Sequence, residues 1–195
     1  MARKQSAAAK YTVPGLDTAT GTEVAEILQE RLHALNDLAL TLKHIHWNVV
    51  GPHFIAVHKM LDPQVEAVRA MVDETAERIA TLGVSPVGTP GALVAARSWD
   101  DYEIGRAGAL EHLGALDVVY TGVIESHRKA IEATEETDPV TQDMLIDQAS
   151  KLELFHWFVR AHLENVGGEL ATAGAKTEAE GARRASGRKS SRRSA

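Results

Sequence analysis

The sequence of 195 residues contains no cysteine, and aromatic residues make up only 5% of it. The absence of cysteine excludes a disulfide framework and any zinc site built from thiolates. No apolar run approaches the roughly 20 residues of a membrane-spanning helix, and the N-terminus lacks the charged and then apolar stretches of a secretory signal. We therefore expect a cytoplasmic protein, whose 44% hydrophobic content suffices for one domain with a buried core.

Apolar residues recur every three or four positions over most of the chain, which is typical of amphipathic helices. A first helix is predicted up to the break at Gly51-Pro52, and Thr20 and Glu23 have the spacing of a capping box at its start. A second helix follows the break, where the apolar positions run from Val57 to Ile79. These two helices are expected to form a hairpin.

The second half of the chain predicts another pair of helices. The stretch 83–98 has three glycines and two prolines and is predicted to be a long crossover link, with a short helix over residues 92–97. A third helix should begin near Trp99, with Ser98 as its N-cap. A fourth should begin at Asp138-Pro139, a cap followed by a residue of fixed φ. The predicted fold class is all-α, with four helices, one crossover and no strands.

A polar face of the second helix carries histidine and carboxylate residues at helical spacing. The residues are His58, Asp62, Asp73 and Glu77, and they lie about 100° from the apolar stripe. His46 falls about as far before the turn as His58 falls after it, so the two imidazoles can meet across the hairpin. Imidazole with carboxylate favours Fe(II), Mn(II) or Zn(II). The alternative is a solvated helix face on which His58 and Asp62 form an ordinary i, i+4 pair.

Within one chain, these ligands lie too far apart to close such a site. Asp73 lies 15 residues after His58, and Glu77 lies 15 residues after Asp62, which is about 22 Å along a helix. If the second helix packs antiparallel against its own copy about a two-fold axis, paired residue numbers have a constant sum. The pairs 58 with 77 and 62 with 73 both sum to 135. The spacing therefore predicts two equivalent sites, each built from two chains.

Four motifs then resemble the signature of the Dps family, the ferritin-like DNA-protection proteins of starved bacterial cells. They are H-W-N at 46–48, G-x-x-F at 51–54, V-H-x-M-L-D at 57–62 and D-x-x-x-E at 73–77. The resemblance covers roughly residues 20–168, and no ligand position departs from it. It implies a ferritin-like four-helix bundle, which we place at residues 16–170, and a hollow shell of twelve subunits.

The resemblance also implies a chemistry. A ferroxidase centre with two irons, Fe(II) before and Fe(III) after oxidation, would be shared between two-fold partners and held by His46, His58, Asp62, Asp73 and Glu77. Hydrogen peroxide would take two electrons in one site, which limits the escape of hydroxyl radical, and the ferric product would be stored in the shell. Trp47 would lie beside the iron site, although packing at an interface is its simpler role.

The two ends of the chain differ from the body. Residues 1–15, with Arg3, Lys4 and Lys10, are predicted to be a flexible arm, and residues 171–195 are too polar to bury a core and are predicted to be disordered. Six cations occur near the end: Arg183, Arg184, Arg188, Lys189, Arg192 and Arg193. Without them the net charge of −6 becomes −12. Such a basic tail predicts non-specific DNA binding and association with the nucleoid. The alternative is a tail that only aids solubility.

Three further hypotheses follow from the sequence. Glu30 with His33 and Glu153 with His156 both spell E-x-x-H, which in some bundles builds a di-iron site within a single chain. A non-enzymatic alternative is a nucleoid-compacting protein with a structural metal. Finally, Asp138 and Asp143 begin the fourth helix where Dps-like shells have acidic three-fold pores, although both also suit the positive end of a helix dipole.

Overall fold

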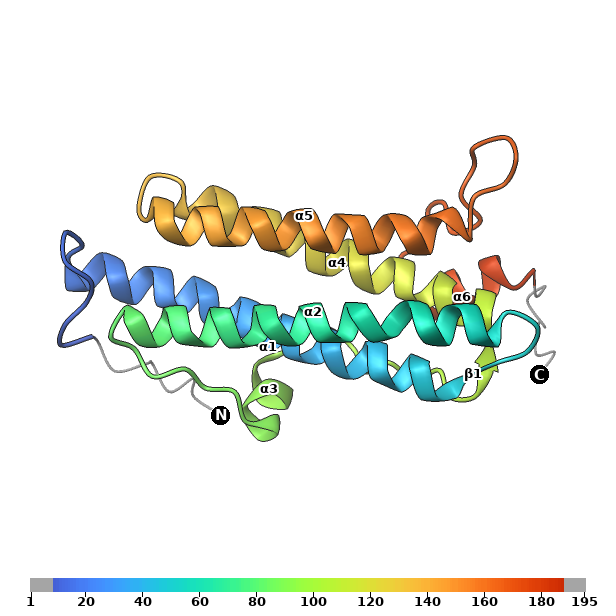
Figure 1. Ribbon diagram of the computed structural model, residues 1–195, viewed down its shortest axis with the longest axis horizontal. Helices are drawn as coiled ribbons and strands as arrows, with labels where there is room; N and C mark the ends of the chain where they lie inside the picture. The colour runs from blue at the N-terminus through green and yellow to red at the C-terminus, as the bar shows by residue number, and fades with distance from the viewer. Residues whose placement is uncertain (1–8, 188–195) are drawn as a thin grey trace, which may run out of the picture. The chain divides into compact units, whose positions relative to one another are not determined.

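The computed structural model describes residues 9–187 of the chain. Figure 1 follows its helices in chain order. The elements are α1 (Thr18–Asn48), β1 (Val49–Val50), α2 (Phe54–Thr81), α3 (Pro90–Ala96), β2 (Ala107–Gly108), α4 (Ala109–Thr134), α5 (Pro139–Ala161) and α6 (Glu178–Ala185). The all-α prediction is confirmed, since the only strands over these residues are two of two residues each. No described helix is long and apolar enough to cross a membrane.

The chain divides into two compact units, and each long helix contributes one part to each. The first unit comprises residues 1–39, 66–99 and 125–150, and the second comprises residues 40–65, 100–124 and 151–195. We describe the contacts of each unit separately.

The first unit is built on an apolar cluster from all four long helices. Its buried members are Val24, Ala25, Leu28, Leu32, Ile79, Leu82, Val84, Ala130 and Leu145. The α1 and α2 members are those that the three-to-four periodicity picks out, because that spacing puts them on one helix face. Burial of such a cluster is the main favourable contribution to folding of this unit.

The N-terminus of α1 differs from the prediction. Asp17, rather than Thr20, caps the helix, because its Oδ1 accepts hydrogen bonds of 3.0 Å from the backbone N–H groups of Ala19 and Thr20. The Thr20 hydroxyl also donates to Asp17 Oδ2 at 2.6 Å. These hydrogen bonds lower the pKa of Asp17 below its ordinary value. The capping-box prediction was wrong because a stronger capping residue lies three positions earlier.

Part of the predicted flexible arm is ordered against the first unit. The Ala9 N–H donates to Thr22 Oγ1 at 3.2 Å. The Tyr11 carbonyl lies where a Cβ at Gly83 would be, and Gly83 has a positive φ of 84°, so only glycine fits this turn. These contacts hold Ala9 and Tyr11 of the predicted arm against α1 and the turn after α2. Arg3 and Lys4 lie outside the described residues.

The crossover link contains a short helix, as predicted, which forms α3 (Pro90–Ala96). The side chain of Gln29 on α1 makes two hydrogen bonds with Val87 in the link. Its amide N–H donates to the Val87 carbonyl at 3.0 Å, and its amide oxygen accepts from the Val87 N–H at 2.9 Å. Farther on, Trp99 Nε1 donates to Asp37 at 2.6 Å. The side chain of Gln29 therefore satisfies both backbone groups of Val87, while Asp37 binds the side chain of Trp99.

Buried His127 on α4 should make the first unit sensitive to acid. Burial, with the charge of Arg31, lowers the pKa of His127 to about 4. The unfolded chain, with an ordinary histidine pKa of about 6.5, binds more protons between these values, so stability should fall as pH drops from about 6.5 to 4. We expect His127→Leu to lose less stability over this range than the parent, measured by denaturant unfolding, with exposed His53→Leu as the control. Equal pH dependence in all three proteins would contradict this assignment.

In the second unit, α4 begins ten residues later than predicted, at Ala109. Residues 100–106 instead run without helix into β2, which pairs in parallel with β1 through Val49 opposite Ala107 and Val50 opposite Gly108. His44 Nε2 lies 2.9 Å from the Ile104 carbonyl and donates to it. Ile104 lies at helical spacing from the apolar residues that follow it, but its carbonyl is bound to His44 on α1, and β2 begins three residues later. The predicted helix start at Trp99 was therefore wrong. The prediction that the chain has no strands was wrong as well.

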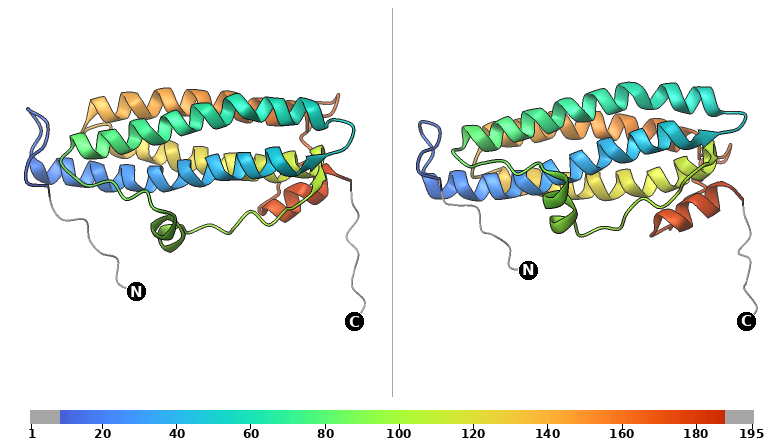
Figure 2. Two further views of the ribbon diagram at one scale, coloured as in Figure 1. Left: turned by 60° about the horizontal axis from the view of Figure 1, so that its bottom comes forward. Right: turned by 90° about the horizontal axis from the view of Figure 1, so that it is seen from below.

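Residues 171–187 are ordered, which corrects the prediction of disorder for that part of the tail, while residues 188–195 lie outside the described residues. The Thr172 hydroxyl donates to Asp117 Oδ2 on α4 at 2.6 Å, and Thr177 caps α6 by accepting from the Glu180 N–H at 3.2 Å. A Cβ on Gly181 would lie 2.2 Å from the Gly114 carbonyl, so the two backbones meet where neither residue has a side chain. Figure 2 shows α6 beside the start of α4. Close glycine packing does not need the large apolar residues whose absence suggested disorder.

Candidate metal centre

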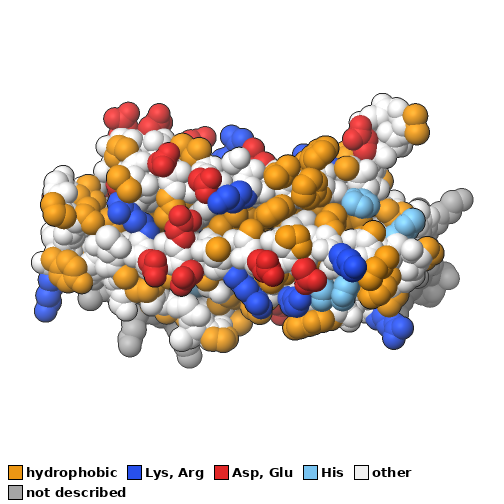
Figure 3. Space-filling model, viewed as in Figure 1, with side chains coloured by type: hydrophobic (Ala, Val, Ile, Leu, Met, Phe, Trp, Pro, Cys, Tyr) orange, Lys and Arg blue, Asp and Glu red, His pale blue; other side chains and the backbone are white. Residues whose placement is uncertain are grey.

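The turn between α1 and α2 brings His46 and His58 together as the sequence predicts. His46 is in the last turn of α1 and is 7% exposed, while His58 is in the second turn of α2. The two rings stack with centroids 3.7 Å apart and planes inclined by 22°. Figure 3 shows histidine and acidic side chains close together on the surface of this region.

Each of the two histidines bonds to the backbone of the other. His46 Nδ1 lies 2.9 Å from the His58 carbonyl, and His58 Nδ1 lies 2.8 Å from the His46 carbonyl. A carbonyl oxygen only accepts, so each Nδ1 carries the proton. In the neutral rings the lone pair is then on Nε2, as in most metal-bound histidines, where the other nitrogen donates to a backbone or carboxylate group. The reciprocal bonds therefore fix both rings in the form that binds a metal.

Asp62 lies one turn beyond His58 and joins this pair. Its Oδ1 accepts from Lys43 Nζ at 2.9 Å and lies 3.2 Å from His46 Nδ1. The hydrogen bond from Lys43 lowers the pKa of Asp62 below its ordinary value. The carboxylate is therefore ionised at neutral pH and able to bind a cation. Lys43 lies one turn before His46 on the same side of α1, and the spacing of histidine and carboxylate residues does not reveal it as a partner of Asp62.

The described residues of one chain do not bring a complete set of metal ligands together. Over residues 9–187, no group of three or more histidine, aspartate and glutamate residues is arranged to hold a metal ion. Asp62 is turned toward Lys43 and toward the protonated nitrogen of His46, rather than toward the Nε2 atoms. Asp73 and Glu77 lie farther along α2 in the first unit, and both are exposed. They are thus accessible to a second chain.

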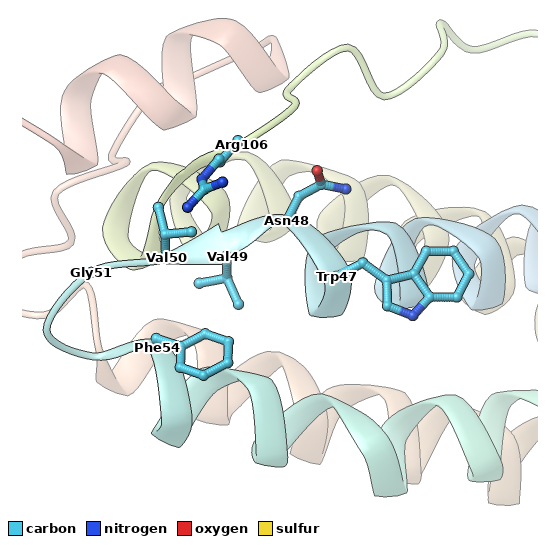
Figure 4. A pocket seen from close by; sticks show the side chains of 7 residues that line it. All are labelled: Trp47, Asn48, Val49, Val50, Gly51, Phe54 and Arg106. Atoms are coloured by element: carbon cyan, nitrogen blue, oxygen red, sulfur yellow. The ribbon is translucent and has the colours of Figure 1, made fainter.

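Phe54 lies against the histidine pair, and Trp47 follows His46 in the sequence. Trp47 is 70% exposed and Phe54 is 38% exposed, and both line a shallow hollow with residues 48–51 and Arg106. In Figure 4, Phe54 points toward Val49 while Trp47 points away from both. The Phe54 ring also lies 4.9 Å from the His58 ring. Large exposed aromatic side chains next to the candidate ligands favour the packing of another chain here.

The two E-x-x-H histidines already have other partners. His33 Nε2 lies 2.9 Å from the Val87 carbonyl in the link. His156 Nε2 lies 2.7 Å from Asp117 Oδ1, and Arg160 Nε donates to the same oxygen at 3.0 Å. Burial alone would raise the pKa of Asp117, but hydrogen bonds from His156, Thr172 and Arg160 lower it to about 2. These contacts stabilise the bundle and the C-terminal segment, which weighs against a di-iron site at these histidines.

The two pore candidates differ in exposure. Asp138 is 5% exposed, and it accepts hydrogen bonds of 2.6 Å from Arg78 Nη2 and from the Thr141 hydroxyl. Burial would raise the pKa of Asp138, but these bonds lower it. A carboxylate buried within one chain stays buried in an assembly, so Asp138 does not fit a pore-lining role. Exposed Asp143 stays a prediction.

The basic residues of the tail are partly described. Arg183 and Arg184 are exposed on α6, and the Arg184 guanidinium donates to the Ala173 carbonyl. The other four predicted DNA-binding residues, Arg188, Lys189, Arg192 and Arg193, lie outside the described residues.

Comparison with known proteins identifies the family. Residues 25–167 match the ferritin-like domain family. The DNA protection during starvation protein of Mycolicibacterium smegmatis is 59% identical over 168 residues, which cover 86% of this chain and 92% of that protein. The solved structure of DpsA14 from Streptomyces coelicolor matches with a TM-score of 0.83 and 63% identity, covering 85% of this chain and 98% of that one. Mycobacterium smegmatis Dps matches with a TM-score of 0.84 and 59% identity, covering 86% and 95%. The chain therefore belongs to the ferritin-like family and, within it, to the DNA-protection-during-starvation (Dps) proteins, which confirms the resemblance and the ferritin-like bundle.

Proposed function

We propose that this chain assembles into a hollow shell, oxidises Fe(II) with hydrogen peroxide at centres shared between two copies, and stores the ferric product inside. The observation that carries this proposal is the reciprocal His46–His58 pair, which leaves the Nε2 lone pairs of both rings free of these hydrogen bonds, with the ionised carboxylate of Asp62 one helical turn from His58. Imidazole and carboxylate together suit Fe(II). Iron is the substrate here, and it supplies the electrons that reduce peroxide.

The incomplete ligand set supports a centre between copies. His46, His58 and Asp62 gather at one turn, whereas Asp73 and Glu77 lie exposed on the same helix, 11 to 19 residues after the α2 members of that group. An antiparallel two-fold pairing of α2 places Glu77 of one copy at His58 of the other, and Asp73 at Asp62. Asp62 would then bind the cation instead of Lys43, and carboxylates from the second copy would be the other neighbours of that cation. Twelve copies, as in the family resemblance, would enclose the store.

We also propose that the shell binds DNA without sequence preference through its basic C-terminal residues, in the cytoplasm and on the nucleoid. The Mycolicibacterium relative is named for DNA protection during starvation. Arginine and lysine side chains beyond a docked helix can reach phosphates, which carry no sequence information. Removing iron and peroxide from solution and covering DNA would both protect it.

Absorbance of the ferric product separates this proposal from a compacting protein with a structural metal. Fe(II) is added to the assembled shell with stoichiometric peroxide and, separately, with air alone. We expect fast oxidation with peroxide, at a rate well above that of Fe(II) and peroxide without protein. A rate equal to that of the protein-free mixture would refute iron oxidation by the protein and favour the alternative of a compacting protein with a structural metal.

A further inference from the structure

The reciprocal bonds of His46 and His58 use two backbone carbonyls that lie in different parts of their helices. The His46 carbonyl, which accepts from His58 Nδ1, is one of the last four carbonyls of α1, and these have no partner within a helix. The His58 carbonyl, which accepts from His46 Nδ1, lies inside α2, where it also faces the N–H of Asp62 four residues later. This second carbonyl must tilt outward from the axis of α2 to accept from α1 as well.

A proline lies inside α2 close to this carbonyl. Pro63 follows His58 by five residues. It has no N–H, so the Lys59 carbonyl receives no helical hydrogen bond from position 63, and the proline ring pushes that carbonyl aside. The carbonyls of His58 and Lys59 belong to consecutive peptide groups, so a displacement of the second tilts the first. Proline also disfavours the helical conformation of the residue before it, which is Asp62. Pro63 therefore loosens the helical turn that carries His58 and Asp62.

The position of Pro63 weakens α2 without a gain in burial. Proline is the least favourable residue in a helix interior. Pro63 is exposed, so its ring adds little to the apolar core. The other prolines in the described helices, Pro90 and Pro139, are the first residues of α3 and α5, where an N–H has no helical bond to make. A residue that weakens its helix next to candidate ligands indicates a role in the geometry of those ligands.

We propose that Pro63 is a positioning residue of the candidate metal centre. By tilting the His58 carbonyl toward α1, it lets this carbonyl accept from His46 Nδ1 at 2.9 Å, which keeps the His46 proton on Nδ1 and the Nε2 lone pair free for iron. Pro63 binds neither iron nor peroxide and acts through His58 and His46. Groups that orient metal-bound histidines in this way strongly affect metal affinity and activity. The role of Pro63 in iron oxidation rests on the proposed function.

The first experiment restores the missing N–H with Pro63→Ala. Alanine is the best helix former, and its N–H can donate to the Lys59 carbonyl, so the thermal unfolding midpoint of the shell should rise. The regular turn should draw the His58 carbonyl back toward the helix axis and slow peroxide-dependent Fe(II) oxidation by about 10- to 100-fold. A proline with only a structural role would leave the rate unchanged or lower the rate and the midpoint together, and either result would overturn the proposal.

The second experiment measures the His46 ring in shells without iron, so that it does not depend on the proposed ferroxidase. The histidine nitrogens are isotopically labelled, sedimented shells are studied by solid-state nuclear magnetic resonance at neutral pH, and His46→Ala identifies the His46 signals. In the parent, we expect His46 Nδ1 to be protonated and Nε2 to be unprotonated. In Pro63→Ala, we expect a second set of His46 signals with the proton on Nε2. Identical His46 signals in the two proteins would refute the positioning role.

The matched control is Pro139→Ala, which makes the same substitution at the first position of α5, where no helical hydrogen bond is gained. It should match the parent in its His46 signals and in its oxidation rate. Equal changes in Pro139→Ala and Pro63→Ala would refute a local effect of Pro63. If the parent oxidises no iron while Pro63→Ala still changes the His46 signals, the ferroxidase proposal fails and the positioning of His46 stands. If the parent oxidises iron and the His46 signals do not change, the positioning role fails and the ferroxidase proposal stands.

Discussion

Replacing His58 by alanine is expected to slow peroxide-dependent Fe(II) oxidation by about a hundredfold or more, and His46→Ala should have a similar effect. Loss of a residue that only orients a metal ligand commonly costs 10- to 100-fold, and here a proposed ligand itself is removed. Each substitution also removes the ring that donates one of the two reciprocal hydrogen bonds, and with it the stacked neighbour of the other ring. Because either loss already breaks the ligand pair, the double variant should be little worse than either single one.

The shells of these variants should still assemble, because the apolar stripes of α1 and α2 remain. The matched control is His53→Ala, an exposed histidine of the same turn. Initial rates are followed by absorbance, and the assembly by size-exclusion chromatography. Parental rates in assembled His46→Ala and His58→Ala shells would refute the site. Inactivation by Glu153→Ala or His156→Ala instead, with folding intact, would point to the single-chain alternative.

Loss of the basic residues beyond α6 should have the second large effect, on DNA binding. Each phosphate neutralised contributes about −0.9 to the slope of log affinity against log salt. A tail that engages four to six phosphates should thus lose about 10²- to 10³-fold in affinity between 50 and 200 mM salt. Many tails on one shell raise the effective concentration after the first contact, so the assembly should bind DNA where a tail peptide does not.

Because α6 is a defined helix, its contribution to DNA binding can be separated from that of the basic residues that follow it. Truncation after Gly187 removes Arg188, Lys189, Arg192 and Arg193 but keeps α6, whereas truncation after Gly181 removes the second half of that helix as well. We expect the shorter deletion to abolish the gel shift at moderate salt, and replacement of the same four residues by glutamine to do the same. Full binding by both truncations would move the contact to the arm with Arg3, Lys4 and Lys10. A marked preference between two unrelated duplexes would contradict a phosphate-only mechanism.

Hydrophobic periodicity was sufficient to predict the helices whose apolar faces are buried. It placed α1 and α2 and their turn, and with them the meeting of His46 and His58, because equal distances from a hairpin turn put residues at the same height. It failed where strand pairing and hydrogen bonds, rather than apolar burial, determine the local structure. The segment before Ala109 has apolar residues at helical spacing, but pairing of β2 with β1 and the His44 contact hold it extended.

Small and polar residues account for the features that the sequence did not reveal. The contact of Gly114 with Gly181 docks α6 through backbone atoms, so it leaves no hydrophobic signal. Lys43 binds Asp62 from the other helix of the hairpin, and Asp117 joins α4 to α5 and to Thr172 by hydrogen bonds across 39 and 55 positions. Pairings of this kind depend on the packed fold rather than on local spacing.

Mixing two inactive variants tests most directly whether the centre is shared between copies. His58→Ala and Glu77→Ala proteins are unfolded and refolded together, and mixed assemblies are verified by mass spectrometry. In a mixed two-fold pair, one site should carry both lesions and the other none. The account predicts that such assemblies recover up to half of the parental oxidation rate per mixed pair, while each variant refolded alone stays inactive. Verified mixed assemblies with no recovered activity would place the site within one chain and contradict the account.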